Sequence, residues 1–205
     1  DALGQERVIV RREAPVSGTT IKLSIDLRLQ RILEERIQAA VKRLPQRTRA
    51  GAVGIALDPE SGAIRAMVSL PSYDPRLFST SRSVDSISTV FQDPQQPLFS
   101  RAISGEYPSG STIKPVIALA ALEEGVISQS TTVLSVGGIR ISQWFFPDWL
   151  AGGHGITDVK KALADSVNTF FYMIGGGYGS VKGLGVDRMG EWLKKFFIGS
   201  KLGID

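Results

Sequence analysis

The sequence predicts a mixed α/β fold that is rich in helices and has a β-hairpin in its N-terminal half. Three observations carry this prediction: a helical repeat of apolar residues over 27–44, two β-prone runs on either side of a turn at 58–62, and a long apolar run after residue 115. The chain has 205 residues, 42% of them hydrophobic, which is enough to bury a core. One domain is therefore expected, with or without an appendage.

Composition disfavours several classes of protein. The net charge is +4, and no run of five or more like charges occurs, so a nucleic-acid surface is not expected. The sequence contains no cysteine and a single histidine, His154, which disfavours zinc fingers, thiol catalysis and histidine-based metal sites. We therefore expect neither a metal nor a cofactor.

The N-terminal part begins with a polar, extended lead-in over residues 1–20. Residues 21–25 have the composition of a short strand. Asp26 then occupies the position of a helix N-cap, and apolar residues follow at helical spacing as far as Leu44, directly before Pro45. This pattern predicts an amphipathic helix over 27–44.

The next elements are read from turn residues and apolar runs. Residues 52–57 and 63–70 are predicted to pair as a hairpin. Residues 71–107 hold several prolines and many serines with little periodicity, and so long an irregular segment usually carries function. A helix is predicted from Ser111 to Glu124, with Gly125 at its end, and the remainder is predicted to be mostly helical.

Ser111 and Lys114 lie three residues apart at the expected start of this helix, so their side chains share one face. A serine hydroxyl becomes a good nucleophile only when a base takes its proton. Burial and the positive end of the helix dipole both disfavour the ammonium form, so Lys114 could serve as that base. S-x-x-K alone is a weak signal, because it occurs by chance about once in a chain of this length. An ordinary helix start is the alternative.

A second pattern is Ser166-Val167-Asn168, which contains the single asparagine of the sequence. A hydroxyl can relay a proton between Lys114 and a leaving group, and an amide can hold a substrate peptide. Taken alone, S-x-N favours a helix-capping serine followed by a surface asparagine.

Together, S-x-x-K followed by S-x-N is the ordered pair of penicillin-recognising serine enzymes. The segment PLFSRAISGEYPSGSTIKPVIALAALEEGVI resembles the active-serine segment of class B, high-molecular-weight penicillin-binding proteins. TIKLSIDLRLQ, AGAVGIALDPESGAIRAMVSLPSYDPRLF and HGITDVKKALADSVNTFFYMIG are similar to further stretches of that family in the same order. The resemblance covers nearly all of residues 15–205, and FQDPQQPLFSRA favours the penicillin-binding protein 2 branch, the transpeptidases of cell elongation.

The resemblance implies an α/β (α+β) penicillin-binding transpeptidase fold, with residues 1–20 as a lead-in segment and residues 21–205 as the N-terminal part of the transpeptidase domain. The hairpin should lie beside the first helix, and the Ser111 helix should be central. The implied activity is that of a peptidoglycan D,D-transpeptidase, which cross-links stem peptides through a serine acyl-enzyme and is acylated by β-lactams.

The same resemblance assigns roles to four residues. Ser111 would be the nucleophile, Lys114 its general base, Ser166 a further catalytic residue and Asn168 a substrate-binding residue. The implied partners are stem peptides ending in D-Ala-D-Ala, β-lactam antibiotics and proteins of the cell-elongation machinery. The implied location is extracytoplasmic, in the periplasm or on the outer face of the cytoplasmic membrane.

The sequence departs from the family at its third motif, K-T-G or K-S-G, which follows well downstream on a strand. Lys201-Leu202-Gly203 lies too near S-x-N to be that motif. We therefore expect this chain to be part of a longer enzyme, with an incomplete site, most later sheet strands missing and a membrane anchor outside these residues. The hairpin is then expected to have an unpaired edge.

Two other functions stay open. A serine β-lactamase or D,D-carboxypeptidase uses the same acyl-enzyme chemistry, although class A β-lactamases usually have aspartate where this chain has Val167. A non-catalytic module that binds cell-wall assembly partners could lack the third motif.

Two further features favour structural interpretations. His154 could suggest Ser-His catalysis, but it lies in a glycine-flanked turn, where a structural role is favoured. Trp144, Phe145, Phe146 and Trp149 could wall a substrate groove, but core or interface packing is favoured.

Overall fold

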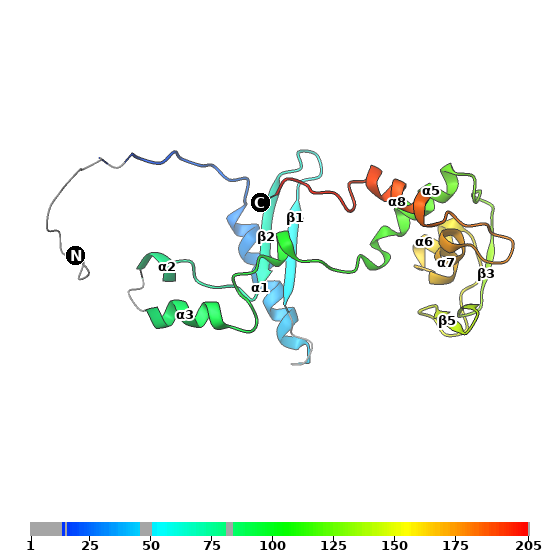
Figure 1. Ribbon diagram of the computed structural model, residues 1–205, viewed down its shortest axis with the longest axis horizontal. Helices are drawn as coiled ribbons and strands as arrows, with labels where there is room; N and C mark the ends of the chain where they lie inside the picture. The colour runs from blue at the N-terminus through cyan, green and yellow to red at the C-terminus, as the bar shows by residue number, and fades with distance from the viewer. Residues whose placement is uncertain (1–13, 15, 46–50, 81–83, 205) are drawn as a thin grey trace. The chain divides into compact units, whose positions relative to one another are not determined.

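The computed structural model describes residues 14, 16–45, 51–80 and 84–204. It divides into two compact units, Asp1–Gly105 and Glu106–Asp205, and each has its own packing (Figure 1). Most of the predicted lead-in segment lies outside the described residues, and the domain boundary at residue 20 stays a prediction.

The first unit is built on one helix and a hairpin. Helix α1, Leu27–Arg43, begins where the Asp26 carboxylate accepts hydrogen bonds from the backbone N–H groups of Arg28 and Leu29, at 2.9 and 3.1 Å. Strands β1, Ala52–Leu57, and β2, Ile64–Leu70, pair antiparallel with Ala52 opposite Leu70. The predicted helix and hairpin are both confirmed.

Helix α1 packs along the hairpin (Figure 1). Gly54 of β1 makes close approach possible, because a Cβ atom there would collide with the side chain of Ile37. The Gln30 amide also forms two hydrogen bonds with the backbone of Met67 in β2: Nε2 donates to the carbonyl oxygen, and Oε1 accepts from the N–H, both at 2.8 Å. The hairpin therefore lies beside the first helix, as expected.

The outer edge of β2 is bonded at two residues. Gln30 satisfies the backbone of Met67, and the Asp26 N–H donates to the Arg65 carbonyl oxygen at 2.8 Å. Among the described residues the hairpin is a two-stranded sheet, so neither β1 nor β2 has a second strand as a partner. The predicted strand at 21–25 is wrong, because those residues form no strand and Ser24 instead bonds the Ile64 carbonyl oxygen through its side chain.

The segment 71–107 is more regular than predicted. Its described residues form three short helices, α2 (Leu77–Thr80), α3 (Val84–Gln92) and α4 (Arg101–Ser104). Edge-to-face contacts of Phe78 with Tyr73 and Phe91 connect α2 and α3, at ring separations of 5.6 and 6.3 Å. Because these helices are short, the prolines and serines around them conceal their periodicity.

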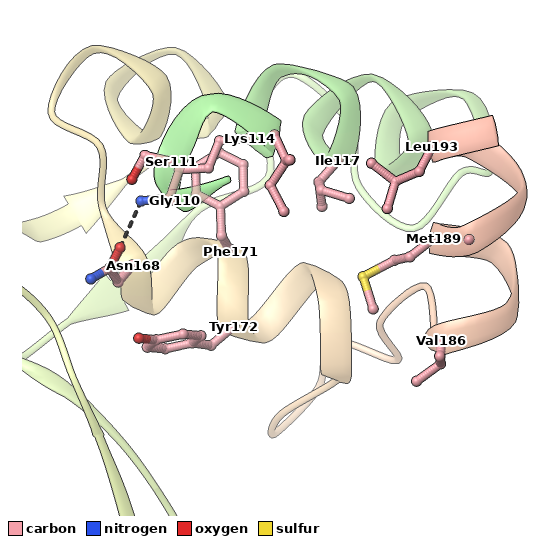
Figure 2. Close-up of a pocket in the computed structure, with 12 residues that line it drawn as sticks. Gly110, Ser111, Lys114, Ile117, Asn168, Phe171, Tyr172, Val186, Met189 and Leu193 are labelled. Atoms are coloured by element: carbon pink, nitrogen blue, oxygen red, sulfur yellow. Dashed lines mark hydrogen bonds between the residues drawn. The ribbon is translucent and has the colours of Figure 1, made fainter. Parts of the chain in front are cut away.

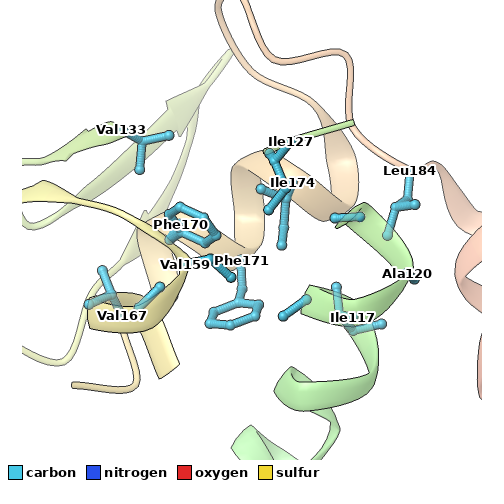
Figure 3. Packing of buried hydrophobic residues seen from close by; sticks show 13 residues of the cluster. Ile117, Ala120, Ile127, Val133, Val159, Val167, Phe170, Phe171, Ile174 and Leu184 are labelled. Atoms are coloured by element: carbon cyan, nitrogen blue, oxygen red, sulfur yellow. The ribbon is translucent and has the colours of Figure 1, made fainter. Parts of the chain in front are cut away.

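The second unit has a helical core. Its main helices are α5 (Lys114–Glu123), α6 (Val159–Ala164), α7 (Asn168–Gly176) and α8 (Val186–Lys195). Phe170 and Ile174 of α7 are fully buried and pack in one cluster with Ile117 and Ala120 of α5 (Figure 3). The Ser111 helix is thus central to its own unit, and α7 is the most deeply buried element beside it.

The remainder after Gly125 was predicted to be mostly helical, and this is wrong for residues 133–157. It forms two antiparallel pairs, β3 (Val133–Ser135) with β6 (Gly155–Thr157) and β4 (Gly138–Ile141) with β5 (Trp144–Pro147). Gly137 and Gly138, at φ of 99° and 146°, adopt a conformation that a helix does not allow.

The aromatic residues of this stretch are not core residues. Trp144, Phe145, Phe146 and Trp149 all remain exposed, so the core half of the expectation is wrong, and packing at an interface stays a prediction. The ring of Phe146 packs against Tyr172 of α7, with 5.8 Å between the ring centres.

Taken together, the described residues form a helix-rich α/β arrangement with three two-stranded sheets, and the predicted fold class is confirmed.

We predict that Gln30→Ala weakens the attachment of α1 to the hairpin. Two hydrogen bonds are lost, each with a net contribution of about 1 kcal/mol, and the Met67 N–H loses its acceptor. Amide hydrogen exchange at Met67 should become faster, and urea denaturation should show a lower free energy of unfolding. Gln38→Ala is the matched control, because among the described residues that side chain bonds the exposed Glu34 on its own helix and not the hairpin. Equal exchange at Met67 in both variants would contradict the assignment.

Candidate active site

Ser111 lies in a single turn of 3₁₀ helix, Gly110–Ile113, that leads directly into α5. The predicted helix from Ser111 to Glu124 is therefore present in two parts, a tight first turn and an α-helix from Lys114 to Glu123. Gly110 has a φ of +56°, a left-handed conformation that glycine adopts at little cost. Pro115 falls in the first turn of α5, where a missing N–H is tolerated.

Lys114 is a buried lysine that points from α5 to the start of α7 (Figure 2). Its Nζ donates hydrogen bonds to the carbonyl oxygen of Ser166 at 2.8 Å, to Ser166 Oγ at 3.1 Å and to Asn168 Oδ1 at 2.6 Å. These three acceptors use all three protons of an ammonium group. The two sequence patterns are thus joined through one nitrogen atom.

Ser166 completes the connection to Ser111. Its Oγ donates to Ser111 Oγ at 3.0 Å, so Lys114 Nζ, Ser166 Oγ and Ser111 Oγ form an unbroken chain of hydrogen bonds. Ser166 has a φ of 54°, which is uncommon for a residue other than glycine. Such a conformation persists only where the surroundings fix it, and here the turn between α6 and α7 directs both the hydroxyl and the carbonyl oxygen of Ser166 at Lys114.

Two opposing effects set the protonation of Lys114. Burial disfavours the ammonium form and lowers the pKa of Lys114, and the nearby negative charge of Asp148 raises it; burial is the larger effect. The ring of Phe171 lies 5.1 Å from Nζ and also favours the cation. The net result is an amine whose pKa lies below that of an ordinary lysine, as a general base requires.

A pocket of about 660 Å³ opens beside these residues. Ser111, Lys114 and Asn168 line its polar end, while Ile117 of α5 and Met189 of α8 lie at the apolar end (Figure 2). An extended ligand with one polar, reactive end would match this division. Within the described residues, no group of three or more histidine and acidic side chains is arranged to hold a metal ion.

Asp148 was not predicted from the sequence. Its carboxylate accepts backbone N–H groups at the start of α7, the helix that carries Asn168. Burial alone would raise its pKa, but the N–H groups of Thr169, Asn168 and Trp149 outweigh burial and hold the pKa of Asp148 below the usual value. The signal in the sequence is the apolar Val167 at the helix start, which cannot cap the helix by itself.

His154 is buried away from the serine hydroxyls. Its Nε2 lies 3.7 Å from Asp148 Oδ1, and its Nδ1 lies 3.9 Å from Asp165 Oδ2. The ring also contacts Trp149 edge to face. These contacts support the structural interpretation of His154, because the hydrogen-bonded chain from Lys114 to Ser111 does not include it.

Comparison with known proteins decides the family. Residues 52–205 match the family described as "Penicillin binding protein transpeptidase domain". The chain belongs to this family. The predicted resemblance is confirmed, and the elements described above form part of the penicillin-binding transpeptidase fold.

Individual members of this family are similar in sequence to most of this chain. "Peptidoglycan D,D-transpeptidase MrdA" of Escherichia coli K12 is 38% identical over 193 residues, which are 93% of this chain and 28% of the relative. The chain thus spans little more than a quarter of that relative's length.

Two solved structures show the same fold. A complex of penicillin-binding protein 2 with MreC from Helicobacter pylori has a TM-score of 0.70 at 27% identity and covers 95% of this chain and 34% of its counterpart. The imipenem acyl-enzyme of penicillin-binding protein A from M. tuberculosis has a TM-score of 0.70 at 27% identity and covers 86% and 40%.

We predict that Gly110→Ala destabilises the turn that presents Ser111. Alanine fits the open space there, but a left-handed conformation costs a residue with a Cβ atom about 1–2 kcal/mol. Gly190→Ala in α8 is the control, because it also meets open space but has no positive φ, so it should stabilise the helix by about 0.5–1 kcal/mol. Urea denaturation measures both changes. Changes of the same sign would contradict the role of Gly110.

Proposed function

We propose that this chain supplies the nucleophile and the proton relay of a peptidoglycan D,D-transpeptidase. The observation that carries the proposal is the chain of hydrogen bonds from Lys114 through Ser166 to Ser111, made by S-x-x-K and S-x-N residues in a member of this family. The substrates would be stem peptides ending in D-Ala-D-Ala, and β-lactams would acylate the same serine.

The proposed reaction begins with neutral Lys114. Two of its N–H groups donate to the Ser166 carbonyl oxygen and to Asn168 Oδ1, and its lone pair then faces Ser166 Oγ. The two hydroxyls first rotate, so that Ser111 donates to Ser166 Oγ instead of accepting from it. Ser166 then passes its proton to Lys114 and takes the proton of Ser111, so that Ser111 Oγ can attack a carbonyl carbon. No proton has to travel farther than one hydrogen bond at each step.

Acylation and deacylation then follow by transfer of one acyl group. Ser111 Oγ forms an ester with the penultimate D-Ala carbonyl, the C–N bond to the terminal D-Ala breaks, and the leaving amine takes a proton from Lys114 through Ser166. The amine of a second stem peptide then attacks the ester, loses a proton along the same path and restores the Ser111 hydroxyl. In a β-lactam, the bond that breaks is the ring amide, so the leaving group stays attached.

Partners and location form part of this proposal. The relative from Escherichia coli is a peptidoglycan D,D-transpeptidase, and the structure from Helicobacter pylori is a complex with MreC, which supports an elongation protein as partner. We place the chain extracytoplasmically, where peptidoglycan is assembled. No helix among the described residues has the length and apolar character needed to span a membrane.

We predict that benzylpenicillin forms a covalent adduct on Ser111 in the parent protein, meaning the full product of the gene that encodes this chain. Ser111→Ala should abolish the adduct. Lys114→Ala should slow its formation by about 100- to 10,000-fold, the usual contribution of a general base. Mass spectrometry of the treated protein and its peptides locates and times the adduct.

Other outcomes identify other functions. An adduct on a different residue refutes the site, and a folded parent protein that forms none would be a non-catalytic module. Rapid hydrolysis of the adduct would indicate a β-lactamase, and release of D-Ala from a stem peptide without cross-linking would indicate a carboxypeptidase.

A further inference from the structure

Helix α7, whose first residue is Asn168, begins without a side-chain cap from its own N-cap residue. Val167 occupies the N-cap position, and no side-chain hydrogen bond caps the helix from there. The first N–H groups of a helix have no partners within it, and leaving them buried and unpaired is costly. Val167 itself is fully buried, so water does not replace the missing cap.

Asp148 supplies the missing acceptor from 20 residues earlier in the chain. Its Oδ1 accepts the Asn168 N–H at 3.0 Å, and its Oδ2 accepts the Thr169 N–H at 3.0 Å. The carboxylate is itself held in place, because Oδ1 also accepts the Trp149 N–H at 2.9 Å and Oδ2 accepts the Ser135 hydroxyl at 3.2 Å. The Asp148 side chain is completely buried, so solvent does not compete for these hydrogen bonds.

The orientation of Asn168 therefore depends on a residue outside the pocket. Asp148 bonds the backbone of Asn168, whose side-chain oxygen in turn accepts from Lys114 Nζ at 2.6 Å. Asp148 does not line the pocket. Any effect on the reaction must pass through Asn168 and Lys114.

We propose that Asp148 is a positioning residue, which fixes the start of α7 so that Asn168 and Ser166 meet Lys114 and which also sets the electrostatic environment of that amine. This inference rests on the proposed function of Lys114 as the base. It adds Asp148, which belongs to neither motif, to the residues that hold the start of α7 in place for Lys114.

Several charged or titratable groups surround this carboxylate. Lys114 approaches from α5, His154 lies 3.7 Å away in the loop before β6, and Asp165 lies on the other side of the His154 ring at the end of α6. Lys161 of α6 donates to the His154 carbonyl oxygen at 2.8 Å. Because Asp148 raises the pKa of Lys114, removing its charge should let the amine lose its proton at lower pH.

The test is the pH profile of acylation in the parent protein. The rate of labelling by a fluorescent penicillin is measured across pH for the unchanged protein and for Asp148→Asn. The maximal rate should fall by about 10- to 100-fold, because a small displacement of a catalytic group has effects of this size. The rising, acidic part of the profile should shift to lower pH. The shift is the decisive readout, because a general loss of structure would lower the rate without moving the profile.

Asp158→Asn is the matched control. Asp158 caps the neighbouring helix α6 through the Lys161 N–H at 2.8 Å and has no bond to α7 or Lys114. Asparagine caps a helix about as well as aspartate, so the rate should stay within about twofold and the profile should not move. His154→Gln is combined with Asp148→Asn to exclude titration of the neighbouring imidazole: the shift should persist in the absence of His154.

Each remaining outcome is decisive. An unchanged maximal rate in Asp148→Asn, an unmoved profile, or a shift that vanishes with His154→Gln would each overturn the inference. If Asp148→Asn does not fold, Ser135→Ala replaces it, because this change removes one hydrogen bond from the carboxylate and leaves its charge. A rate equal to that of Asp158→Asn would then overturn the inference. Labelling that survives Ser111→Ala would instead refute the proposed function.

Discussion

The second unit depends on the burial of one amine between two helices. The Lys114 side chain extends from α5 to the turn before α7. There its amine donates hydrogen bonds to the carbonyl oxygen and hydroxyl of Ser166 and to the amide oxygen of Asn168. Removing a lysine from water is expensive unless such acceptors compensate it. The positions of Ser166 and Asn168 are therefore tied to the position of α5, and Ser111 is three residues away on the same turn.

The hydrophobic core also fixes the position of α7 relative to α5. Phe170 and Ile174, on the helix that begins at Asn168, are fully buried against α5 (Figure 3). Close packing allows little sliding of one helix along the other. At the start of α7, Asp148 accepts the N–H groups of Asn168 and Thr169. A buried ionic group, a capped helix start and an apolar core thus act on one short turn, which explains how Ser166 keeps its left-handed backbone.

The sequence predicted the parts that depend on local patterns. The helix at 27–44 follows from a long helical repeat, and the hairpin follows from two β-prone runs around a turn. The pairing of S-x-x-K with S-x-N was recognisable because the order of the two motifs and the segments around them resemble the penicillin-binding proteins. The strands between 133 and 157 are only three or four residues long, too short for a period of two to stand out. Asp148 was hidden because its contacts cross 20 residues of chain.

We propose that burial lets Lys114 act as a base despite the neighbouring carboxylate of Asp148. The titration of the Lys114 amine tests this, followed by NMR in parent protein with ¹⁵N-labelled lysine side chains, with Lys114→Arg to identify the signal. Burial is the larger of the two effects, so the amine should lose its proton at a pKa below the ordinary value of 10.5. A pKa at or above 10.5 would contradict this role, because Lys114 would then stay charged and could not accept a proton from Ser111 through Ser166.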